Sequence, residues 1–406
     1  MGGARIVIVG ASLAGLRAAE ELRSRGHAGP IDLVGAEPHR PYDRPPLSKQ
    51  VLAGKQPPEA TELQVAGGSV DDLDVTWHLD TTATGLDLAA RTVQLGGGDR
   101  LPYDGLVIAT GAHARRLPGT DHLAGVHTLR TLDDCLAIRA ALEAVPRRVA
   151  VIGAGFIGAE VAATCRGLGI DVTLIEALPV PLERALGAEM GAVMAEIHRE
   201  HGVDVRLGVG VVTVEGGDRV ERVRLTDGTV LDVDVVVVGI GVAPNTDWLA
   251  TSGLTIDNGV VCDATCLAAP LVVAAGDVAR WPNQRFDEVM RVEHWENAIE
   301  MGAHAARTLL ADLGGSRGEP FAPVPWFWSD QYDRKVQLAG RSGADDVVEV
   351  VSGTVDERRF VAFYGRAGRL VGVLGMNQAA KVMRWRAFVE EGRPFDEAVA
   401  AARETA

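Results

Sequence analysis

Two copies of one strand–turn–helix–strand pattern constrain the fold of this chain more than any other feature. In the first copy, the β-branched run Ile6–Val9 leads into the glycine-containing turn Gly10–Gly15, and the helical stretch Leu16–Ser24 follows. A β-branched run this short is typical of a buried parallel strand. A second strand, Ile31–Val34, ends just before Glu37, which lies 22 residues beyond the last glycine of the turn. We therefore expect a parallel βαβ unit at the N-terminus.

The small residues of the first turn have distinct roles. Gly10 permits a tight turn from strand to helix, and Gly15 lets the helix and the strand pack closely. A small residue between them lets the backbone approach a pyrophosphate held at the helix N-terminus. Ser12 stands at this middle position, where glycine is usual. With Glu37 near the distance expected for a ribose-binding acid, the pattern predicts a dinucleotide site.

The same pattern recurs in the middle of the chain, in a more complete form. The strand Arg148–Ile152 leads into Gly153–Gly158, a full G-x-G-x-x-G, and the helix Ala159–Gly167 follows. The next strand, Asp171–Ile175, ends at Glu176, 18 residues past the last glycine. This copy predicts a second dinucleotide site.

The duplication extends beyond the two glycine turns. A hairpin strand and a buried strand are expected at Thr92–Leu95 and Tyr103–Gly111 in the first half, and at Arg222–Leu225 and Asp234–Gly241 in the second. Both buried strands end in glycine, as a strand end that meets a nucleotide requires. The chain is thus expected to hold two related halves that bind one dinucleotide each.

The segment after the second half also has features of a binding site. The apolar strand Leu271–Ala275 is followed by Asp277, which presents a carboxylate where strand ends usually meet ligand. A helix is expected at Glu296–Leu310, just after Trp295. The N-terminal amides of this helix could receive an electron-rich carbonyl group. An ordinary surface acid and helix cap are the alternative for either feature alone.

The C-terminal part of the chain, Phe321–Ala406, has a different pattern. Alternating residues in Trp326–Tyr332 and Lys335–Gly340 predict an antiparallel sheet. Three further strands and two helices are expected at Val347–Val351, Arg359–Tyr364, Leu370–Met376, Gln378–Glu391 and Asp396–Arg403.

Charge and hydropathy exclude two classes of partner. The chain has 40 Lys+Arg and 55 Asp+Glu, a net charge of −15, which argues against nucleic acid. Its longest uncharged apolar runs, such as Cys266–Gly276, reach about half of the ~20 residues that a membrane helix needs. The apolar N-terminus is not interpreted as a signal peptide, because cleavage there would remove the first glycine turn.

The cysteines and histidines suggest no metal site. Four cysteines in 406 residues are too sparse for a disulfide scaffold, and we interpret them as reduced thiols of a cytoplasmic protein. Cys262 and Cys266 form the only close pair, and no second pair completes a zinc or iron–sulfur set. We interpret His198 and His201, three residues apart on a predicted helix, as a surface pair. Any iron–sulfur cluster is therefore expected on another molecule.

These motifs together resemble a known family. The resemblance rests on residues 10–17, 42–49, 109–111, 153–160, 275–277 and 326–331. The chain resembles the FAD-dependent pyridine nucleotide oxidoreductases, an α/β, glutathione-reductase-like fold with two Rossmann-type dinucleotide-binding domains and a small α+β C-terminal domain. Within them it is similar to the NADH-dependent ferredoxin reductases that supply cytochrome P450 and ring-hydroxylating dioxygenase systems. The resemblance implies an FAD-binding domain at 1–113 and 243–318, an NADH-binding domain at 114–242 and a C-terminal domain at 319–406.

The resemblance also implies roles for individual residues. Those expected to contact FAD are Gly10, Ser12, Ala14, Gly15, Glu37, Arg44, Lys49, Ala83, Thr110, Gly111, Arg130, Asp277 and Trp295. Those expected to contact NADH are Gly153, Gly155, Ile157, Gly158, Glu160, Glu176 and Gly241. Lys49 would lie beside the reactive edge of the flavin and pair with Glu160. Trp328 would line the nicotinamide side of the flavin, although an aromatic residue in a strand is more often part of a core.

Electrostatics make two of these implied roles reasonable. A lysine beside the flavin stabilises the negative charge that appears when hydride arrives, and a nearby carboxylate keeps that lysine charged despite desolvation. The alternatives are a solvated loop lysine at Lys49 and an exposed helix acid at Glu160. A carboxylate at Glu176 chelates the ribose hydroxyls of NADH and repels the extra phosphate of NADPH. We therefore expect NADH to be preferred.

Two absences narrow the reaction class. Disulfide reductases of this organisation need a Cys-x4-Cys pair early in the first domain, where Arg40–Leu52 contains no cysteine. The single redox cysteine of the related NADH oxidases and peroxidases is missing from the same region. We therefore expect neither disulfide nor peroxide reduction.

An acidic enzyme that meets an acidic ferredoxin needs local positive charge. Candidate docking residues are Lys381, Arg384 and Arg386 on one C-terminal helix, with Arg307, Lys335 and Arg341. An ordinary solvated face explains these charges equally well.

The expected activity is hydride transfer from NADH to tightly bound FAD, followed by single-electron transfer to an iron–sulfur ferredoxin. We expect this ferredoxin to be of the [2Fe-2S] type, and we expect neither nucleic acid nor membrane as partner. A flavin NADH oxidase or quinone reductase is the main alternative. A redox sensor of the apoptosis-inducing-factor type is the other.

Overall fold

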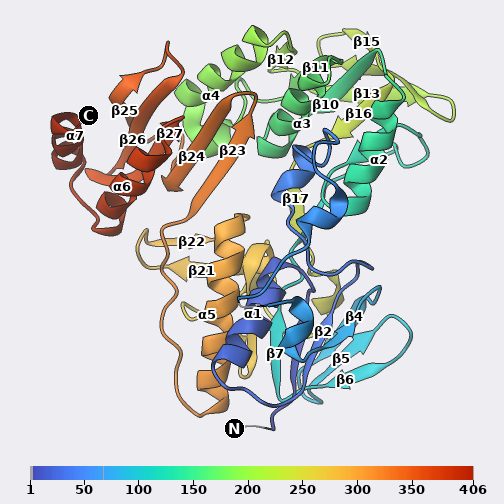
Figure 1. The fold of residues 1–406 in the computed structure, drawn as a ribbon, viewed down its shortest axis with the longest axis vertical. Coiled ribbons are helices and arrows are strands. Elements are labelled where there is room, and N and C mark those ends of the chain that lie inside the picture. Colours follow the sequence, from blue (N-terminus) through green and yellow to red (C-terminus); the bar gives the residue numbers. More distant parts are fainter. Residues whose placement is uncertain (1–2, 67, 406) are drawn as a thin grey trace. The chain divides into compact units, whose positions relative to one another are not determined.

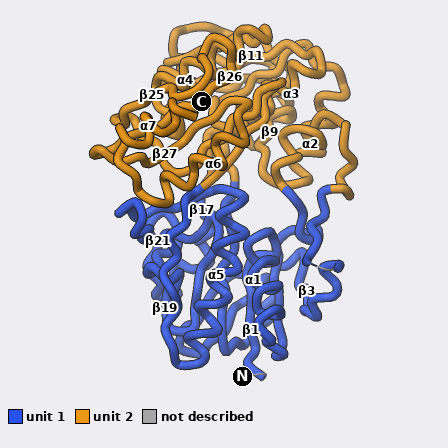
Figure 2. The backbone as a smooth tube through the Cα atoms, turned by 60° about the vertical axis from the view of Figure 1, so that its left-hand side comes forward, with its two compact units in different colours: residues 1–43, 61–113, 243–325 blue, residues 44–60, 114–242, 326–406 orange. Residues whose placement is uncertain are grey.

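The computed structural model describes residues 3–66 and 68–405 and divides into two compact units. Unit 1 comprises Met1–Asp43, Thr61–His113 and Ala243–Pro325. Unit 2 comprises Arg44–Ala60, Ala114–Val242 and Trp326–Ala406 (Figure 2). The short segment that carries Lys49 is thus grouped with the second glycine motif and the C-terminal sheet.

Unit 1 is built on a six-stranded sheet in the order β19-β20-β7-β1-β2-β3, of which Figure 1 labels β7 and β2. Its strands are β1 (Ile6–Val9), β2 (Ile31–Val34), β3 (Thr76–His78), β7 (Gly105–Ile108), β19 (Leu267–Ala269) and β20 (Val272–Ala274). All neighbouring strands are parallel except the β19–β20 pair. Residues of β1, β2, β7 and β20 are buried throughout, and apart from Asp32 of β2 these strands contain only apolar residues and glycine.

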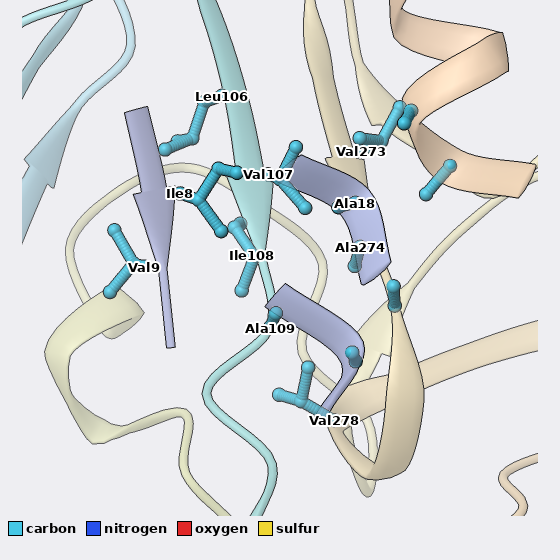
Figure 3. Close-up of a cluster of buried hydrophobic side chains, with 14 of the residues drawn as sticks. Ile8, Val9, Ala18, Leu106, Val107, Ile108, Ala109, Val273, Ala274 and Val278 are labelled. Atoms are coloured by element: carbon cyan, nitrogen blue, oxygen red, sulfur yellow. The ribbon is translucent and has the colours of Figure 1, made fainter. Parts of the chain in front are cut away.

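The core of unit 1 lies where this sheet meets its helices. Side chains of β1, β7 and β20, among them Ile8, Val107 and Val273, cluster with Ala18 of α1 (Figure 3). The helices are α1 (Leu13–Ser24) and α5 (Trp295–Leu313), which pack against each other. The smaller elements are β4 (Ala83–Asp87), β5 (Thr92–Leu95), β6 (Arg100–Pro102), β18 (Val260–Val261), β21 (Ala279–Asn283), β22 (Glu288–Met290), η3 (Val70–Leu73), η4 (Asp247–Leu249) and η5 (Gly276–Val278). The short helix η2 (Pro58–Thr61) belongs to unit 2 except for its last residue.

The middle part of unit 2 repeats this plan. Its parallel sheet has the order β12-β11-β10-β16-β9, so the strand before the glycine turn is central, as β1 is in unit 1. The elements are β9 (Val126–Thr128), α2 (Leu132–Glu143), β10 (Arg148–Ile152), α3 (Phe156–Gly167), β11 (Asp171–Glu176), α4 (Glu183–Glu200), β12 (Asp204–Leu207), β13 (Val211–Gly216), β14 (Val220–Leu225), β15 (Val230–Asp232) and β16 (Val235–Val238). Two short strands, β8 (Ala112–Ala114) and β17 (Val242–Pro244), lie where the chain passes from one unit to the other.

The C-terminal part of unit 2 is the predicted antiparallel sheet, in the order β23-β24-β27-β26-β25. Its elements are β23 (Trp326–Gln331), β24 (Arg334–Gly340), β25 (Val347–Thr354), β26 (Arg359–Arg366), β27 (Arg369–Met376), α6 (Ala379–Glu390) and α7 (Phe395–Glu404). Apolar side chains of this sheet form one buried cluster with α4, including Leu186 and Met190 of the helix and Phe360 of the sheet. The two Rossmann-type halves and the α+β C-terminal segment confirm the expected fold class.

Helices α1 and α3 each begin three residues earlier than predicted. They start at Leu13 and Phe156 rather than at Leu16 and Ala159. The prediction treated each glycine motif as a turn that precedes the helix. In the structure, the last glycine of each motif already lies in the first helical turn.

The interpretation of His198 and His201 as a surface pair was wrong for His198. Its side chain is fully buried, and its Nδ1 lies 2.9 Å from the hydroxyl of Tyr332. The Tyr332 ring also stacks on His201, with ring centroids 3.7 Å apart. The hairpin β23–β24 covers this part of α4, and helical spacing alone cannot reveal such a cover. Within the described residues, no helix combines the length and the apolar character that crossing a bilayer requires.

Burial of His198 predicts a loss of stability in mild acid. Burial lowers the pKa of His198 from 6.5 to about 4, so the folded protein keeps this side chain neutral while the unfolded chain protonates it. The resulting stability is present above pH 6.5 and is lost as the pH falls towards 4. We expect a decrease on the order of 3 kcal/mol in unfolding free energy from this group. Urea unfolding at pH 7 and pH 4.5 measures it.

The control compares two histidine variants. His198→Asn should show a shallower pH dependence than the unmodified chain, whereas His122→Asn, at an exposed position, should leave the dependence unchanged. An equal slope in the His198 variant would contradict the assignment.

Candidate functional site

The first glycine turn, between β1 and α1, has little room for side chains at its two glycines. Gly10 has a φ of +125°, and a Cβ there would lie 2.0 Å from the carbonyl oxygen of Ala109. A Cβ on Gly15 would lie 1.9 Å from the carbonyl oxygen of Gly10. Ser12 between them has an extended backbone, and its side chain makes no capping bond to the helix. The protein thus requires glycine at the two outer positions only.

In the second glycine turn, Gly153–Gly158, the middle position is Gly155. A Cβ on Gly153 would lie 2.4 Å from the carbonyl oxygen of Gly239, and one on Gly158 would lie 2.0 Å from that of Gly153. Gly155 has φ −71° and ψ −179°, which any residue adopts, and among the described residues other than its chain neighbours no atom lies within 4 Å of its ideal Cβ position. A glycine here therefore keeps space open beside the N-terminus of α3. This space fits a dinucleotide pyrophosphate.

A carboxylate follows the second strand of each half, as predicted. Glu176 ends β11 and accepts backbone N–H bonds from Ala154 at 2.7 Å and from Leu178 at 2.9 Å. It is therefore held against the glycine turn. Glu37 follows β2 and accepts a hydrogen bond from the Tyr42 hydroxyl. No sequence argument singled out Tyr42 as the partner of Glu37.

The remaining residues of unit 1 with an expected FAD role lie on several loops and element ends. Thr110 and Asn245 exchange two hydrogen bonds of 2.8 Å, which fix the loop after β7 that also contains Gly111. Asp277 lies in η5, after β20. Trp295 is the first residue of α5 and donates its indole N–H to Asp43 at 2.6 Å. Two others, Ala14 in the first turn of α1 and Ala83 on β4, are buried.

Unit 2 brings Lys49 and Glu160 together. Lys49 follows the 3₁₀ helix η1 (Pro45–Ser48), and Glu160 lies on α3. The Lys49 Nζ is 2.9 Å from the Glu160 Oε2, and the two side chains are 11% and 4% exposed. Neither alternative for these residues, a solvated loop lysine or an exposed helix acid, describes this geometry.

Three residues around Glu160 were not assigned roles from the sequence. Ser48 donates to Oε2 at 2.5 Å, and Ser329 donates to Oε1 at 2.7 Å. Gln331 in turn donates its Nε2–H to the Ser329 hydroxyl at 3.1 Å. Both Ser329 and Gln331 are fully buried on β23. Ser329 and Gln331 lie on the same face of β23 as the buried Phe327. Because alternate residues of a strand share a face, the sequence could have indicated that these two polar side chains point inward.

The opposite face of β23 carries the predicted Trp328. Its ring lies 5.2 Å from that of Trp326, and both tryptophans are only partly buried. Of the other residues with expected roles in unit 2, Arg44 donates to the carbonyl oxygen of Arg130 at 2.6 Å, and Ile157 is 45% exposed at the start of α3. Gly241 follows β16 with a φ of +93°.

The candidate docking residues differ in their surroundings. Lys381 and Arg386 on α6 are partly buried and contact Ser352 and Glu390, whereas Arg384 is exposed. In the same unit, Lys335 pairs with Asp330 at 2.5 Å and Arg341 is partly buried. Arg307 belongs to unit 1, where it pairs with Glu21 at 3.0 Å.

All four cysteines of the chain are buried. Burial raises the pKa of Cys135 to about 11, that of Cys165 and Cys262 to about 12, and that of Cys266 well above its usual value. The reactive form of cysteine is the thiolate, so none of these residues is suited to redox chemistry with a substrate. Among the described residues, no cluster of three or more His, Cys, Asp or Glu side chains could hold a metal ion.

Comparisons with known proteins agree with this geometry. The chain matches the family model for pyridine nucleotide-disulphide oxidoreductases over residues 4–302 and the model for the reductase C-terminal domain over residues 326–406. It is 40% identical to rhodocoxin reductase of Rhodococcus erythropolis over 96% of this chain and 90% of the relative. It is 38% identical to the ferredoxin–NAD(+) reductase component of the anthranilate 1,2-dioxygenase system of Burkholderia cepacia, over 95% and 94%.

The fold is also similar to that of a solved structure. In the covalent putidaredoxin reductase–putidaredoxin complex, the matched chain superposes with a TM-score of 0.91 at 33% identity, covering 99% of this chain and all of the other. The chain therefore belongs to the pyridine nucleotide-disulphide oxidoreductase family, whose oxidoreductases use FAD and a pyridine nucleotide.

Proposed function

We propose that this protein is an NADH:ferredoxin reductase, in which a tightly bound FAD takes hydride from NADH and passes single electrons to an iron–sulfur ferredoxin. The observation that carries the proposal is the buried Lys49–Glu160 ion pair in a chain whose thiols are all buried. The pair suits a group that gains negative charge, and buried thiols leave no disulfide route for the electrons. Relatives of nearly equal length that are named as reductases support the same conclusion.

The residues of each half support an assignment of cofactors to halves. We assign FAD to the first glycine turn, with Glu37 on its adenosine ribose and Asp277 and Trp295 on its flavin portion. We assign NADH to the second turn, with Glu176 on its ribose. The proposed domain ranges are 1–113 with 243–318 for FAD, 114–242 for NADH and 319–406 for the C-terminal domain.

Bound flavin supplies chemistry that no side chain offers, because it accepts two electrons together and releases them singly. The protein's own contribution is electrostatic. The Lys49 ammonium provides positive charge where negative charge develops, and Glu160 keeps that ammonium charged and in place. The glycine turns bind the pyrophosphates through backbone amides, so that the rest of each dinucleotide is oriented.

The electron acceptor must be external. We propose a ferredoxin, of the [2Fe-2S] type, that serves a cytochrome P450 or a ring-hydroxylating dioxygenase in the cytoplasm. Of the candidate docking residues, exposed Arg384 is the most suitable for attracting an acidic partner.

The test of the acceptor is a steady-state comparison. NADH oxidation coupled to cytochrome c reduction should rise at least tenfold when a [2Fe-2S] ferredoxin is added to the holoenzyme. Equal NADH consumption with oxygen or a quinone in place of ferredoxin would instead identify an oxidase or a quinone reductase.

Removing the Lys49 charge should slow hydride transfer. In Lys49→Met we expect a roughly 10²-fold lower rate, comparable to the loss of one preorganised donor at a site of developing charge. Stopped-flow mixing with NADH measures the rate. The matched control is Lys55→Met, because Lys55 is exposed six residues further on. Equal rates in the two variants would show that Lys49 has no electrostatic role.

Glu176 should determine the coenzyme preference. We expect the kcat/KM ratio for NADH over NADPH to fall at least tenfold in Glu176→Gln, because the repulsion of the extra phosphate is lost. Glu189→Gln, an exposed change on α4, serves as the control and should leave the ratio unchanged. A ratio that survives the Glu176 change would place coenzyme selection elsewhere.

A further inference from the structure

The Glu160 carboxylate accepts hydrogen bonds from three donors on two separate segments, the end of η1 and β23. Glu160 is 3% exposed and accepts hydrogen bonds from Ser48, Lys49 and Ser329. Ser48 and Ser329 are themselves 1% and 0% exposed. The arrangement matches an ionised carboxylate, since every partner donates and both oxygens accept.

We propose that Ser48 and Ser329 are positioning residues for the Lys49–Glu160 pair, and that Gln331 sets the direction of the Ser329 hydroxyl. This inference rests on the proposed function. It assigns to the C-terminal segment a part in the hydride-transfer step, through two buried polar side chains on β23.

The direction of the Ser329 hydroxyl follows from its two partners. A serine hydroxyl has one proton to donate. The Gln331 Nε2–H donates to the Ser329 oxygen, so the Ser329 proton is directed at Glu160. Gln331 is fully buried, so its amide is not exchanged for water at the Ser329 hydroxyl.

The backbone that carries Ser48 is held by a separate set of contacts. Thr164, one turn after Glu160 on α3, donates its hydroxyl to the backbone carbonyl of Ser48 at 2.7 Å. Cys135 on α2 donates its thiol to the carbonyl of Leu47 at 3.1 Å. The segment that carries Lys49 is therefore fixed to two helices of its own unit. One oxygen of Glu160, Oε2, thus accepts from Ser48 and Lys49, and the other, Oε1, accepts from Ser329 on β23.

Strand alternation links Ser329 to Trp328. Neighbouring residues of a strand point to opposite faces, so one strand presents Trp328 on one face and Ser329 towards α3 on the other. A shift of β23 by one residue would exchange the two faces. The register of the pair β23–β24, in which Ser329 lies opposite Val336, therefore also determines where the Glu160 donor lies.

The consequence is specific. Without either hydroxyl, the carboxylate loses one of its anchors and can rotate, and the ammonium bonded to it is no longer held in one place. We expect Ser48→Ala and Ser329→Ala each to slow hydride transfer roughly tenfold, the loss typical of one charge-assisted hydrogen bond, with the KM for NADH changed less than twofold.

A second readout follows Lys49 itself. The chain contains only four lysines, Lys49, Lys55, Lys335 and Lys381, so acetylation by limiting acetic anhydride can be measured on each by peptide mass spectrometry. In the holoenzyme of either serine variant, Lys49 labelling should rise at least threefold relative to Lys55. Ser352→Ala, which removes a buried hydroxyl from β25 of the same sheet, is the matched control and should leave the Lys49 labelling and the hydride-transfer rate unchanged.

A double-mutant cycle separates positioning from a general effect on the fold. If Ser329 acts through Glu160, Ser329→Ala should have no further effect on hydride transfer in a Glu160→Gln background. An equal slowing in both backgrounds, or Lys49 labelling that stays at the unmodified level in both serine variants, would overturn the proposal. Either outcome would leave the NADH:ferredoxin activity of the unmodified chain as it is, so the proposed function is tested separately.

Discussion

The proposed hydride transfer depends on the buried ion pair between Lys49 and Glu160. A buried ion pair is weak evidence for stability, since removing two charges from water costs about as much as their attraction returns. Here the carboxylate has two hydroxyl donors in addition to the ammonium. Such complete satisfaction of a costly group is typical of a site where charge is needed for chemistry.

The ion pair is positioned by elements that already have other roles. Glu160 lies in the second turn of α3, the helix whose N-terminus follows the second glycine turn. Any change that moves this helix relative to β10 would therefore move both the pyrophosphate site and the carboxylate. The close approach of Gly158 to the carbonyl of Gly153 restricts such movement, because no larger residue fits between them. The proposed nucleotide site and the proposed electrostatics of hydride transfer thus share one support within unit 2.

The two βαβ halves and their glycine turns could be predicted from the sequence. Strands such as Ile6–Val9 and Arg148–Ile152 are rich in β-branched residues and are followed directly by glycine, and both signals are local. The start of each helix was placed three residues late, because the last residues of a glycine motif are helical as well as part of the turn. The acidic residues after β2 and β11 were found by spacing alone.

The surroundings of the candidate site could not be found in the same way. The strand β23 was predicted, but its pattern did not show that Ser329 and Gln331 face inward while two tryptophans are partly exposed. His198 was interpreted as a surface residue because the hairpin that covers it lies about 130 residues further along the chain. Both outcomes depend on tertiary packing between distant segments, for which periodicity contains no information.

The most direct measurement of the central claim is an anaerobic titration of the purified holoenzyme. Limiting NADH is added to the flavoprotein in the presence of excess oxidised [2Fe-2S] ferredoxin, and the reduced ferredoxin is counted by its absorbance. We expect about two molecules of ferredoxin to be reduced per NADH, since one hydride carries two electrons and each cluster accepts one. A flavin that NADH does not reduce, or a reduced flavin that ferredoxin does not reoxidise, would contradict it.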